Sequence, residues 1–300
     1  MSEVENALRS QRDIWKEVSE RVVGISSREF PPEPPKRVLV FGIGSSHFAA
    51  KLTGYSLMRA RDQLRIPVIS SSSLAVGSEI APQKGDWAFG LSHRGKTPAT
   101  LKGLELADKA GAFTLLVGAQ GLSHVESLPY VKYYLPTCPP EKCEPHTVSV
   151  SSAICAVTTL MLGLRAVEEW DALRSIGDPH LELLRSRVGD GPSILLGEWE
   201  GEWLAREGAL KLMEMASLPV RAFSSEEFFH GPKMSVQENE SIWHVSLAKD
   251  VRNKDIRSDY RVDVRGGSPM SWMPALVELQ WLSLAVALNR GMNPDLGRVE

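Results

Sequence analysis

The sequence has few cysteines, and this scarcity limits the chemistry that it can support. Its 300 residues contain three, Cys138, Cys143 and Cys155, and an odd number cannot all pair within one chain. Free thiols and a reducing compartment are therefore expected. Cys138, Cys143 and His146 lie close together in sequence, but no second cysteine pair and no fourth ligand stand at zinc-finger spacing. The sequence accordingly predicts no metal site.

Excess charge and long hydrophobic runs are also lacking. The net charge is only -3 and there is no polybasic or polyacidic tract, so nucleic acid is not an expected partner. The most apolar segment, residues 273–291, is interrupted by Glu278 and Gln280 and predicts no membrane span. The N-terminus is charged from its third residue and has no apolar signal core. A cytoplasmic globular protein is therefore predicted, with no membrane partner.

What the sequence does contain is an alternation of helix-like and strand-like segments. An amphipathic helix is predicted over residues 2–23, and a proline-rich stretch ends it. Apolar runs of strand length follow at 37–43 and near Pro67, Asp86 and Ala112, with helical stretches between them. A long buried helix is predicted over residues 147–170. This order is typical of a parallel sheet flanked by helices.

The alternation restarts in shorter form in the second half of the chain. Strands are predicted at "SILLGE", "PVRAFSS" and "SIWHVSL", with a helix between the first two and a last helix from Met273. We therefore expect an α/β fold with two subdomains of one ancestry, the second abbreviated. The predicted boundaries are 1–33 for an N-terminal helix and linker, 34–175 for the first subdomain and 176–300 for the second.

The turn "SHRGKT", residues 92–97, has the composition of an anion site. Thr97 and the proline after it are suited to start a helix, whose free N–H groups and partial positive charge favour an anion. Ser92 and Thr97 add hydroxyl donors, the glycine permits close approach, and Arg94 and Lys96 add positive charge. An ordinary capped helix with surface cations is the alternative.

A second turn supports the prediction of an anion site. In "GIGSSH" a strand gives way to Gly44, Ser45 and Ser46 at the start of a helix, and strand ends in a parallel sheet share one crevice. This turn lacks the third glycine of a dinucleotide fingerprint, and "HRGKT" lacks the first glycine of a P-loop. A phosphate is therefore predicted at these turns, and a dinucleotide or nucleoside triphosphate is not.

Catalytic candidates lie in the second half. Glu207, Lys211 and Glu214 fall at i, i+4 and i+7 and therefore on one face of a helix. A solvated salt-bridge stripe has the same spacing, but the apolar neighbours of these residues predict partial burial. His230 follows in "FFHGPK", where glycine and proline predict a turn that presents the imidazole at a strand end. A purely structural histidine is the alternative.

Several of these segments together resemble a known family, and the resemblance covers nearly the whole chain from Arg37 onward. The sequence is similar to proteins with two sugar isomerase (SIS) domains, such as the isomerase half of glucosamine-6-phosphate synthase and stand-alone phosphosugar isomerases and deaminases. The matching segments are "GSSH", "LSHRGKTPATLKGLELADKAGA", "EPHTVSVSSAICAVTTLML", "EGALKLMEMASLPVRAFSSEEFFHGP" and "RGMNPD". The resemblance implies two flavodoxin-like subdomains that bind a sugar 6-phosphate.

The resemblance also implies roles for single residues. The phosphate would be held by Ser46, Ser92, His93 and Thr97, with Gly44, Ser45 and Arg94 in the same turns. Glu214 matches the base that moves a proton between C1 and C2, Lys211 lies beside it, and His230 matches a ring-opening histidine supplied by a neighbouring subunit. The implied assembly is a homodimer with shared sites. No metal or organic cofactor is required.

Two departures leave the reaction open. Arg94 stands where the family usually has a small hydroxyl residue, and the tail has only Arg298 where relatives place a lysine over the sugar. The chain begins with a charged helix and no catalytic N-terminal cysteine, so glutamine-dependent amination is not expected. The expected function is aldose-ketose isomerisation of a hexose or amino-hexose 6-phosphate. The alternatives are an amino-sugar or ketosamine 6-phosphate deaminase and a non-catalytic sugar-phosphate sensor.

Overall fold

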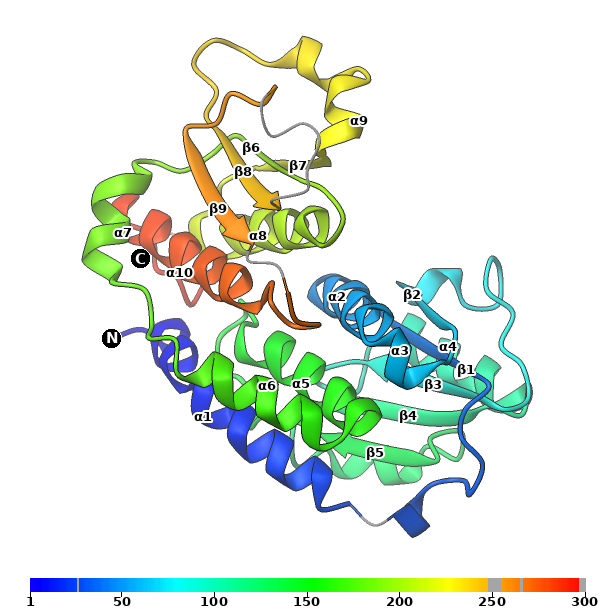
Figure 1. Cartoon of the computed structure of the whole chain (residues 1–300). Helices are drawn as coiled ribbons and strands as arrows, with labels where there is room; N and C mark the ends of the chain where they lie inside the picture. The colour runs from blue at the N-terminus through cyan, green and yellow to red at the C-terminus, as the bar shows by residue number, and fades with distance from the viewer. Residues whose placement is uncertain (26, 248–254, 265–266, 297–300) are drawn as a thin grey trace. The chain divides into compact units, whose positions relative to one another are not determined.

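The chain folds into two compact units, each built on a parallel sheet (Figure 1). The computed structural model describes residues 1–25, 27–247, 255–264 and 267–296, so Arg298 lies outside the described residues. The first-sheet unit comprises Ser10–Glu141 and Val148–Arg174. The second-sheet unit comprises Met1–Arg9, Lys142–Thr147 and Ser175–Glu300. The predicted subdomain boundaries stay a prediction.

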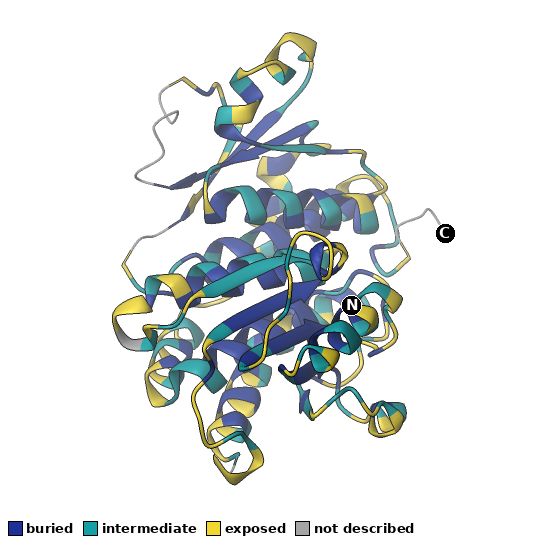
Figure 2. Ribbon diagram, turned by 90° about the vertical axis from the view of Figure 1, so that its right-hand side faces the viewer, coloured by how far each residue is buried: buried dark blue, intermediate teal, exposed yellow. Residues whose placement is uncertain are grey.

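The first-sheet unit has five parallel strands in the order β2-β1-β3-β4-β5. The strands are β1 (Arg37–Gly42), β2 (Val68–Ser72), β3 (Asp86–Leu91), β4 (Phe113–Gly118) and β5 (Tyr133–Pro136). The middle strands are buried almost along their whole length, whereas β2 at the edge is only partly buried (Figure 2). This burial on both faces explains why β1, β3 and β4 read as continuous apolar runs.

Helices connect and flank these strands. They are α1 (Glu3–Val23), whose first residues belong to the second-sheet unit, α2 (Ser45–Arg59), α3 (Arg61–Leu64), α4 (Pro98–Lys109), α5 (Val148–Leu162) and α6 (Leu164–Arg174), with short 3-10 turns η1 (Ser27–Glu29), η2 (Ser73–Ala75) and η3 (Ser123–Ser127). The order of the strands reverses at β1. After β1 the chain moves to β2 on one side of it and then crosses to β3 on the other side. Ligands bind at such a reversal of strand order in open α/β sheets.

The second-sheet unit repeats this plan in shorter form. Its four parallel strands are ordered β7-β6-β8-β9 and are β6 (Ile194–Gly197), β7 (Arg221–Ser224), β8 (Ile242–Leu247) and β9 (Tyr260–Val264). Its helical elements are α7 (Leu181–Val188), α8 (Glu200–Ala216), α9 (Ser225–Phe229), η4 (Pro232–Ser235) and α10 (Met273–Asn289). The prediction of an α/β fold with an abbreviated second sheet is confirmed.

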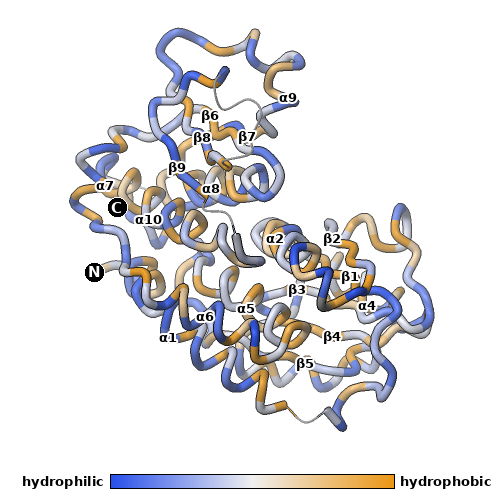
Figure 3. Tube along the Cα trace, in the orientation of Figure 1, coloured by the Kyte–Doolittle hydropathy of each residue, from blue (hydrophilic) through white to orange (hydrophobic). Residues whose placement is uncertain are grey.

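The last helix, α10, is the segment that looked most apolar in the sequence. Hydrophobic residues run along it (Figure 3), and nearly all of them are buried because it packs against α7, α8 and β9. None of the helices in the described ranges is both long and apolar enough to cross a membrane.

Some sequence predictions about the elements are wrong. The single buried helix predicted over residues 147–170 is two helices, α5 and α6, because Gly163 between them has a φ of 63°. A positive φ is readily adopted by glycine and does not continue a right-handed helix. Two edge strands, β5 and β9, were not predicted as strands.

Candidate functional site

Two turns of the first-sheet unit end at the same edge of its sheet. β1 and β3 are parallel neighbours, so the chain leaves both strands on the same side. After β1, Gly44 stands at the N-cap of α2 with a φ of 58°, and Ser45 and Ser46 begin that helix. After β3, residues 92–97 lead into α4. The topology therefore brings the two sets of predicted phosphate contacts to neighbouring strand ends.

The turn at residues 92–97, called the anion turn below, is closed by its own hydrogen bonds. Gly95 has a φ of 60° and its N–H donates to the Ser92 carbonyl at 2.9 Å. The hydroxyls of Ser92 and Thr97 lie 3.0 Å apart, and Ser92 Oγ also accepts from the Thr97 N–H at 3.4 Å. Ser92 is buried, whereas Arg94 and Lys96 are exposed on the turn.

Thr97 occupies the N-cap of α4 as predicted, but its side chain does not cap the helix. Its hydroxyl lies within hydrogen-bond distance of the Ser92 hydroxyl instead. The first-turn N–H groups of an α-helix have no intrahelical acceptor. α2 likewise has no side-chain cap, and neither helix carries an acidic residue in its first turn. Both helix ends thus favour an external anion.

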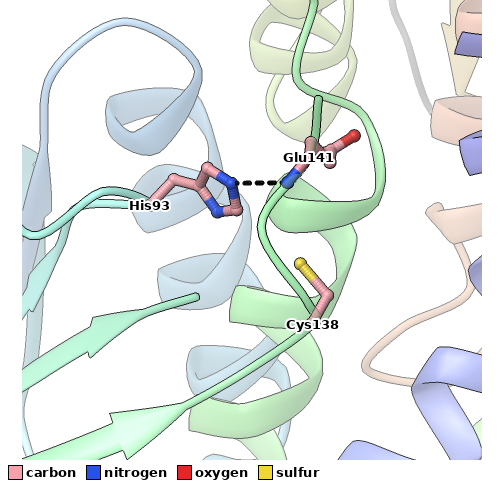
Figure 4. Close-up of side chains that lie close together, drawn as sticks. All are labelled: His93, Cys138 and Glu141. Atoms are coloured by element: carbon pink, nitrogen blue, oxygen red, sulfur yellow. Dashed lines mark hydrogen bonds between the residues drawn. The ribbon is translucent and has the colours of Figure 1, made fainter. Parts of the chain in front are cut away.

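His93 is held by the loop before α5. Its Nε2 accepts the Glu141 N–H at 3.1 Å, as Figure 4 shows. The Glu141 carboxylate in turn accepts the N–H groups of Val148 and Ser149 at 3.1 and 2.8 Å, at the start of α5. Because Nε2 accepts, a neutral His93 carries its proton on Nδ1. The imidazole therefore ties the anion turn to the start of α5.

Cys138 lies near His93 and Glu141, and the three together meet the distance requirement for metal ligands. One ligand atom from each lies within 4.8 Å of the others. A nitrogen, a sulfur and an oxygen of this kind suit zinc. However, His93 and Glu141 already accept the backbone N–H groups described above, and burial raises the pKa of the Cys138 thiol to about 11. These contacts favour a structural network.

In the second-sheet unit, α8 carries a buried row of charges. Glu207 and Lys211 are fully buried, and the Glu214 side chain is 31% exposed. Lys211 Nζ donates to Glu214 Oε2 at 2.5 Å and lies 3.5 Å from Glu207 Oε1. The row is buried because α8 packs against β6, β7 and β8 and also against α10. The predicted partial burial is confirmed, and the solvated-stripe alternative is wrong.

His230 lies at the end of a helix and not, as predicted, at the end of a strand. It caps the C-terminus of the short helix α9, which separates it from the end of β7, so the prediction of a strand-end position is wrong. The cause is Ser224, whose side chain accepts the Glu227 N–H and starts the helix. The His230 side chain is 74% exposed, and its Nε2 lies 3.3 Å from Glu226 Oε1.

Sequence reasoning missed two residues beside the anion turn. Glu141 caps α5 from the preceding loop, and His124 Nε2 lies 3.2 Å from the Gly95 carbonyl oxygen. The contact of His124 with Gly95 spans 29 residues and that of Glu141 with His93 spans 48, and no local pattern in the sequence signals either. All the phosphate candidates thus lie in the first-sheet unit, and Lys211, Glu214 and His230 lie in the second-sheet unit.

Comparisons with known proteins agree with this architecture. No family model matches the chain. A curated relative is the glutamine–fructose-6-phosphate aminotransferase (isomerizing) of Pyrobaculum aerophilum, 24% identical over 306 residues that cover 88% of this chain and 50% of that protein. The chain spans about half the length of this relative and of a second one, a probable glutamine–fructose-6-phosphate aminotransferase (isomerizing) of Acanthamoeba polyphaga mimivirus.

Solved structures of two enzymes share the fold along the whole chain. The tagatose-6-phosphate ketose/aldose isomerase of Escherichia coli superposes with a TM-score of 0.76 at 14% identity, covering 100% of this chain and 96% of that one. The glucosamine-6-phosphate deaminase of Thermotoga maritima has a TM-score of 0.73 at 19% identity, covering 100% and 98%. Together with the sequence relative, they confirm the predicted resemblance to proteins with two sugar isomerase domains.

Proposed function

We propose that the chain is an enzyme that interconverts the aldose and ketose forms of a hexose or amino-hexose 6-phosphate. The observation that carries the proposal is Glu214, a partly exposed carboxylate hydrogen-bonded to the fully buried Lys211. Taking charged groups out of water is costly, and a buried ion pair is weak evidence for stability alone. A reactive role explains why such a row is present.

The substrate class follows from the anion turn. The turn and the two helix ends offer hydroxyls, N–H groups without side-chain caps and nearby positive charge, a set that suits a phosphate dianion. A phosphate bound away from the reacting carbons supplies binding energy that orients them. The two enzymes of similar structure are named for sugar 6-phosphates, which supports the same substrate class for this chain.

The proposed reaction moves one proton between two adjacent carbons. Glu214 removes the proton from C2 of the open-chain aldose, and the C–H electron pair forms the C1–C2 double bond of an enediolate. The same carboxyl group then returns the proton to C1, while a proton passes between the two oxygens to give the ketose. The Lys211 ammonium orients the carboxylate. The reaction itself requires no metal or redox cofactor.

His230 is proposed to open the sugar ring. Its exposed imidazole, beside the Glu226 carboxylate, is free to approach a ligand from outside the second-sheet unit. Delivery of His230 to the site of a partner subunit, and hence a homodimer with shared sites, stays a prediction from the resemblance. The cytoplasmic location stays a prediction as well.

A substrate panel tests the proposal. The protein is incubated with hexose and amino-hexose 6-phosphates, and isomer formation and ammonia release are both recorded. Isomer formation without ammonia supports the proposal, and ammonia release assigns the deaminase alternative. Binding of a sugar phosphate without either product overturns the enzyme assignment in favour of a sensor.

The role of the base is tested by Glu214→Gln, which removes the proton acceptor and keeps the shape. Turnover is expected to fall by about a factor of 1,000 with unchanged affinity for inorganic phosphate. The matched control is Glu202→Gln on the same helix, whose carboxylate pairs with Arg206 at 2.9 Å. The control is expected to keep its activity within about twofold. Equal activities of the two variants would exclude Glu214 as the base.

A further inference from the structure

The anion turn is held against the neighbouring strand by two backbone hydrogen bonds. The Ser92 N–H donates to the Val117 carbonyl at 2.9 Å, and the Ala119 N–H donates to the His93 carbonyl at 2.8 Å. These bonds involve no side chain and depend only on the path of the main chain. They fix the first half of the turn, up to the peptide between His93 and Arg94.

In the second half of the turn, the Gly95–Lys96 peptide is held by a side chain. The Gly95 carbonyl lies 3.2 Å from Nε2 of His124, on the 3-10 turn η3. A carbonyl oxygen only accepts hydrogen bonds, so this Nε2 carries a proton and donates. η3 packs closely here: a Cβ atom at position 95 would lie 3.1 to 3.2 Å from Leu122, His124 and Val125.

The bond from His124 determines where the next N–H points. In a trans peptide the C=O and N–H groups point in opposite directions. Because the Gly95 carbonyl points at η3, the Lys96 N–H of the same peptide points away from it. Among the described residues this N–H has no hydrogen-bond acceptor. It lies one residue before the N-cap of α4, next to the first-turn N–H groups that lack a side-chain cap.

We propose that His124 is a positioning residue of the anion site. It holds the Gly95–Lys96 peptide so that the Lys96 N–H donates to the substrate phosphate. The inference rests on the proposed function, because it takes the anion turn to be a phosphate site. It adds a residue that touches no substrate and acts only through the orientation of one peptide group.

Paired substitutions at His124 separate this role from simple packing. His124→Leu removes the donor, so the Gly95–Lys96 peptide loses the hydrogen bond that orients it. Affinity for inorganic phosphate is expected to fall about 5- to 10-fold, with a matching rise in KM for a sugar phosphate and an unchanged kcat. His124→Gln places an amide N–H2 near the position of Nε2 and is expected to restore affinity to within about twofold. The matched control is His180→Leu, a change of an exposed histidine in the second-sheet unit, which is expected to alter neither quantity.

A measurement on the unmodified chain gives a second test. In ¹⁵N-labelled protein, the Lys96 amide resonance is expected to shift on addition of inorganic phosphate, together with those of Ala99 and Thr100. Shifts of Ala99 and Thr100 without Lys96 overturn the role of His124 and leave the phosphate site intact. Equal losses in His124→Leu and His124→Gln also overturn it. If the wild-type protein shows no response to phosphate or to any sugar phosphate, the proposed function fails and this inference fails with it.

Discussion

α4 and α8 each carry three alternating charges within two turns, yet the two rows are chemically different. The rows are Lys102, Glu105 and Lys109 on α4, and Glu207, Lys211 and Glu214 on α8. On α4 both lysines are exposed, and the helix covers its sheet with one face only. On α8 the sheet lies on one side and α10 on the other, so two of the three charges are fully buried. Similar spacing, i, i+3, i+7 on α4 and i, i+4, i+7 on α8, therefore gives a solvated surface row in one case and a mostly buried charged row in the other.

The contrast extends to the turns that precede α2 and α8. Gly44 has φ 58° and ψ -131°, and Trp199 has φ 54° and ψ -123° at the corresponding N-cap. The same backbone conformation is thus adopted by a glycine in the first-sheet unit and by a tryptophan in the second-sheet unit, where it is strained. α8 carries Glu200 and Glu202 in its first turn, whereas α2 has no acidic residue there. The second helix supplies its own negative charge at its N-terminus, and the first has none, as the proposed phosphate site requires.

Removal of the buried cation is expected to have the largest effect on stability. Lys211→Met leaves the fully buried Glu207 without its opposite charge and is expected to lower the free energy of unfolding by about 3–5 kcal/mol. Lys109→Met, in the solvated row, is expected to lower it by less than about 1 kcal/mol. Denaturant titration of both variants measures the difference. A double variant, Glu207→Leu with Lys211→Met, is expected to recover most of the loss, because the pair is then replaced by apolar groups. Equal losses for the two single variants would remove the energetic distinction between the rows.

An acidic residue at the start of α2 is expected to abolish the difference between the helix ends. Ser45→Glu gives α2 the first-turn charge that α8 already has, and this carboxylate repels a phosphate at short range. Phosphate affinity is expected to fall about 10- to 100-fold, measured by calorimetry. Ser45→Gln is the control of equal size without charge and is expected to retain most of the affinity. A similar loss for Gln and Glu would mean that bulk, and not charge, excludes the anion.

Substitutions at the two N-cap residues, Gly44 and Trp199, are expected to change the free energy of unfolding by smaller amounts and in opposite directions. Gly44→Ala meets no neighbouring atom but places a Cβ at positive φ, and it is expected to lower the free energy of unfolding by about 1–2 kcal/mol. Trp199→Gly relieves strain at a half-exposed side chain and is expected to raise that free energy by about 1 kcal/mol. Gly177→Ala, at a position with ordinary φ and open space, is the neutral control. Destabilisation by Trp199→Gly would show that contacts of the indole outweigh the backbone strain.

Much of the architecture could be predicted from the sequence because local patterns encode it. Buried parallel strands such as β1 and β4 read as continuous apolar runs. The short edge strand β5 contains a proline and gives no such signal. The division of residues 147–170 into two helices depends on the positive φ of Gly163, which a glycine permits but does not require.

The candidate site was predictable where its residues form a local pattern or directly follow neighbouring parallel strands. The spacing and apolar neighbours of Glu207, Lys211 and Glu214 predict a partly buried row, as observed. His124 could not be found in this way, because its contact with Gly95 spans 29 residues and depends on how η3 packs. The spacing of charges also could not distinguish α4 from α8, since burial is decided by α10, which lies far along the chain.

The smallest expected effect that distinguishes the charged rows of α4 and α8 is a shift in the pKa of Glu105 on addition of salt. Hydrogen bonds from Lys109 and Lys102 lower the pKa of Glu105 from 4.5 to about 2. A lowered pKa favours the folded state above the ordinary value, and this contribution is lost as the pH falls from about 4.5 to 2. Because the row is solvated, 1 M salt is expected to raise the Glu105 pKa towards 4.5, as followed by NMR titration of its carboxyl carbon. The ion pair between Lys211 and Glu207 is buried and is expected to respond much less to salt. A Glu105 pKa that stays near 2 in 1 M salt would mean that hydrogen-bond geometry holds the α4 row as firmly as burial holds the α8 row.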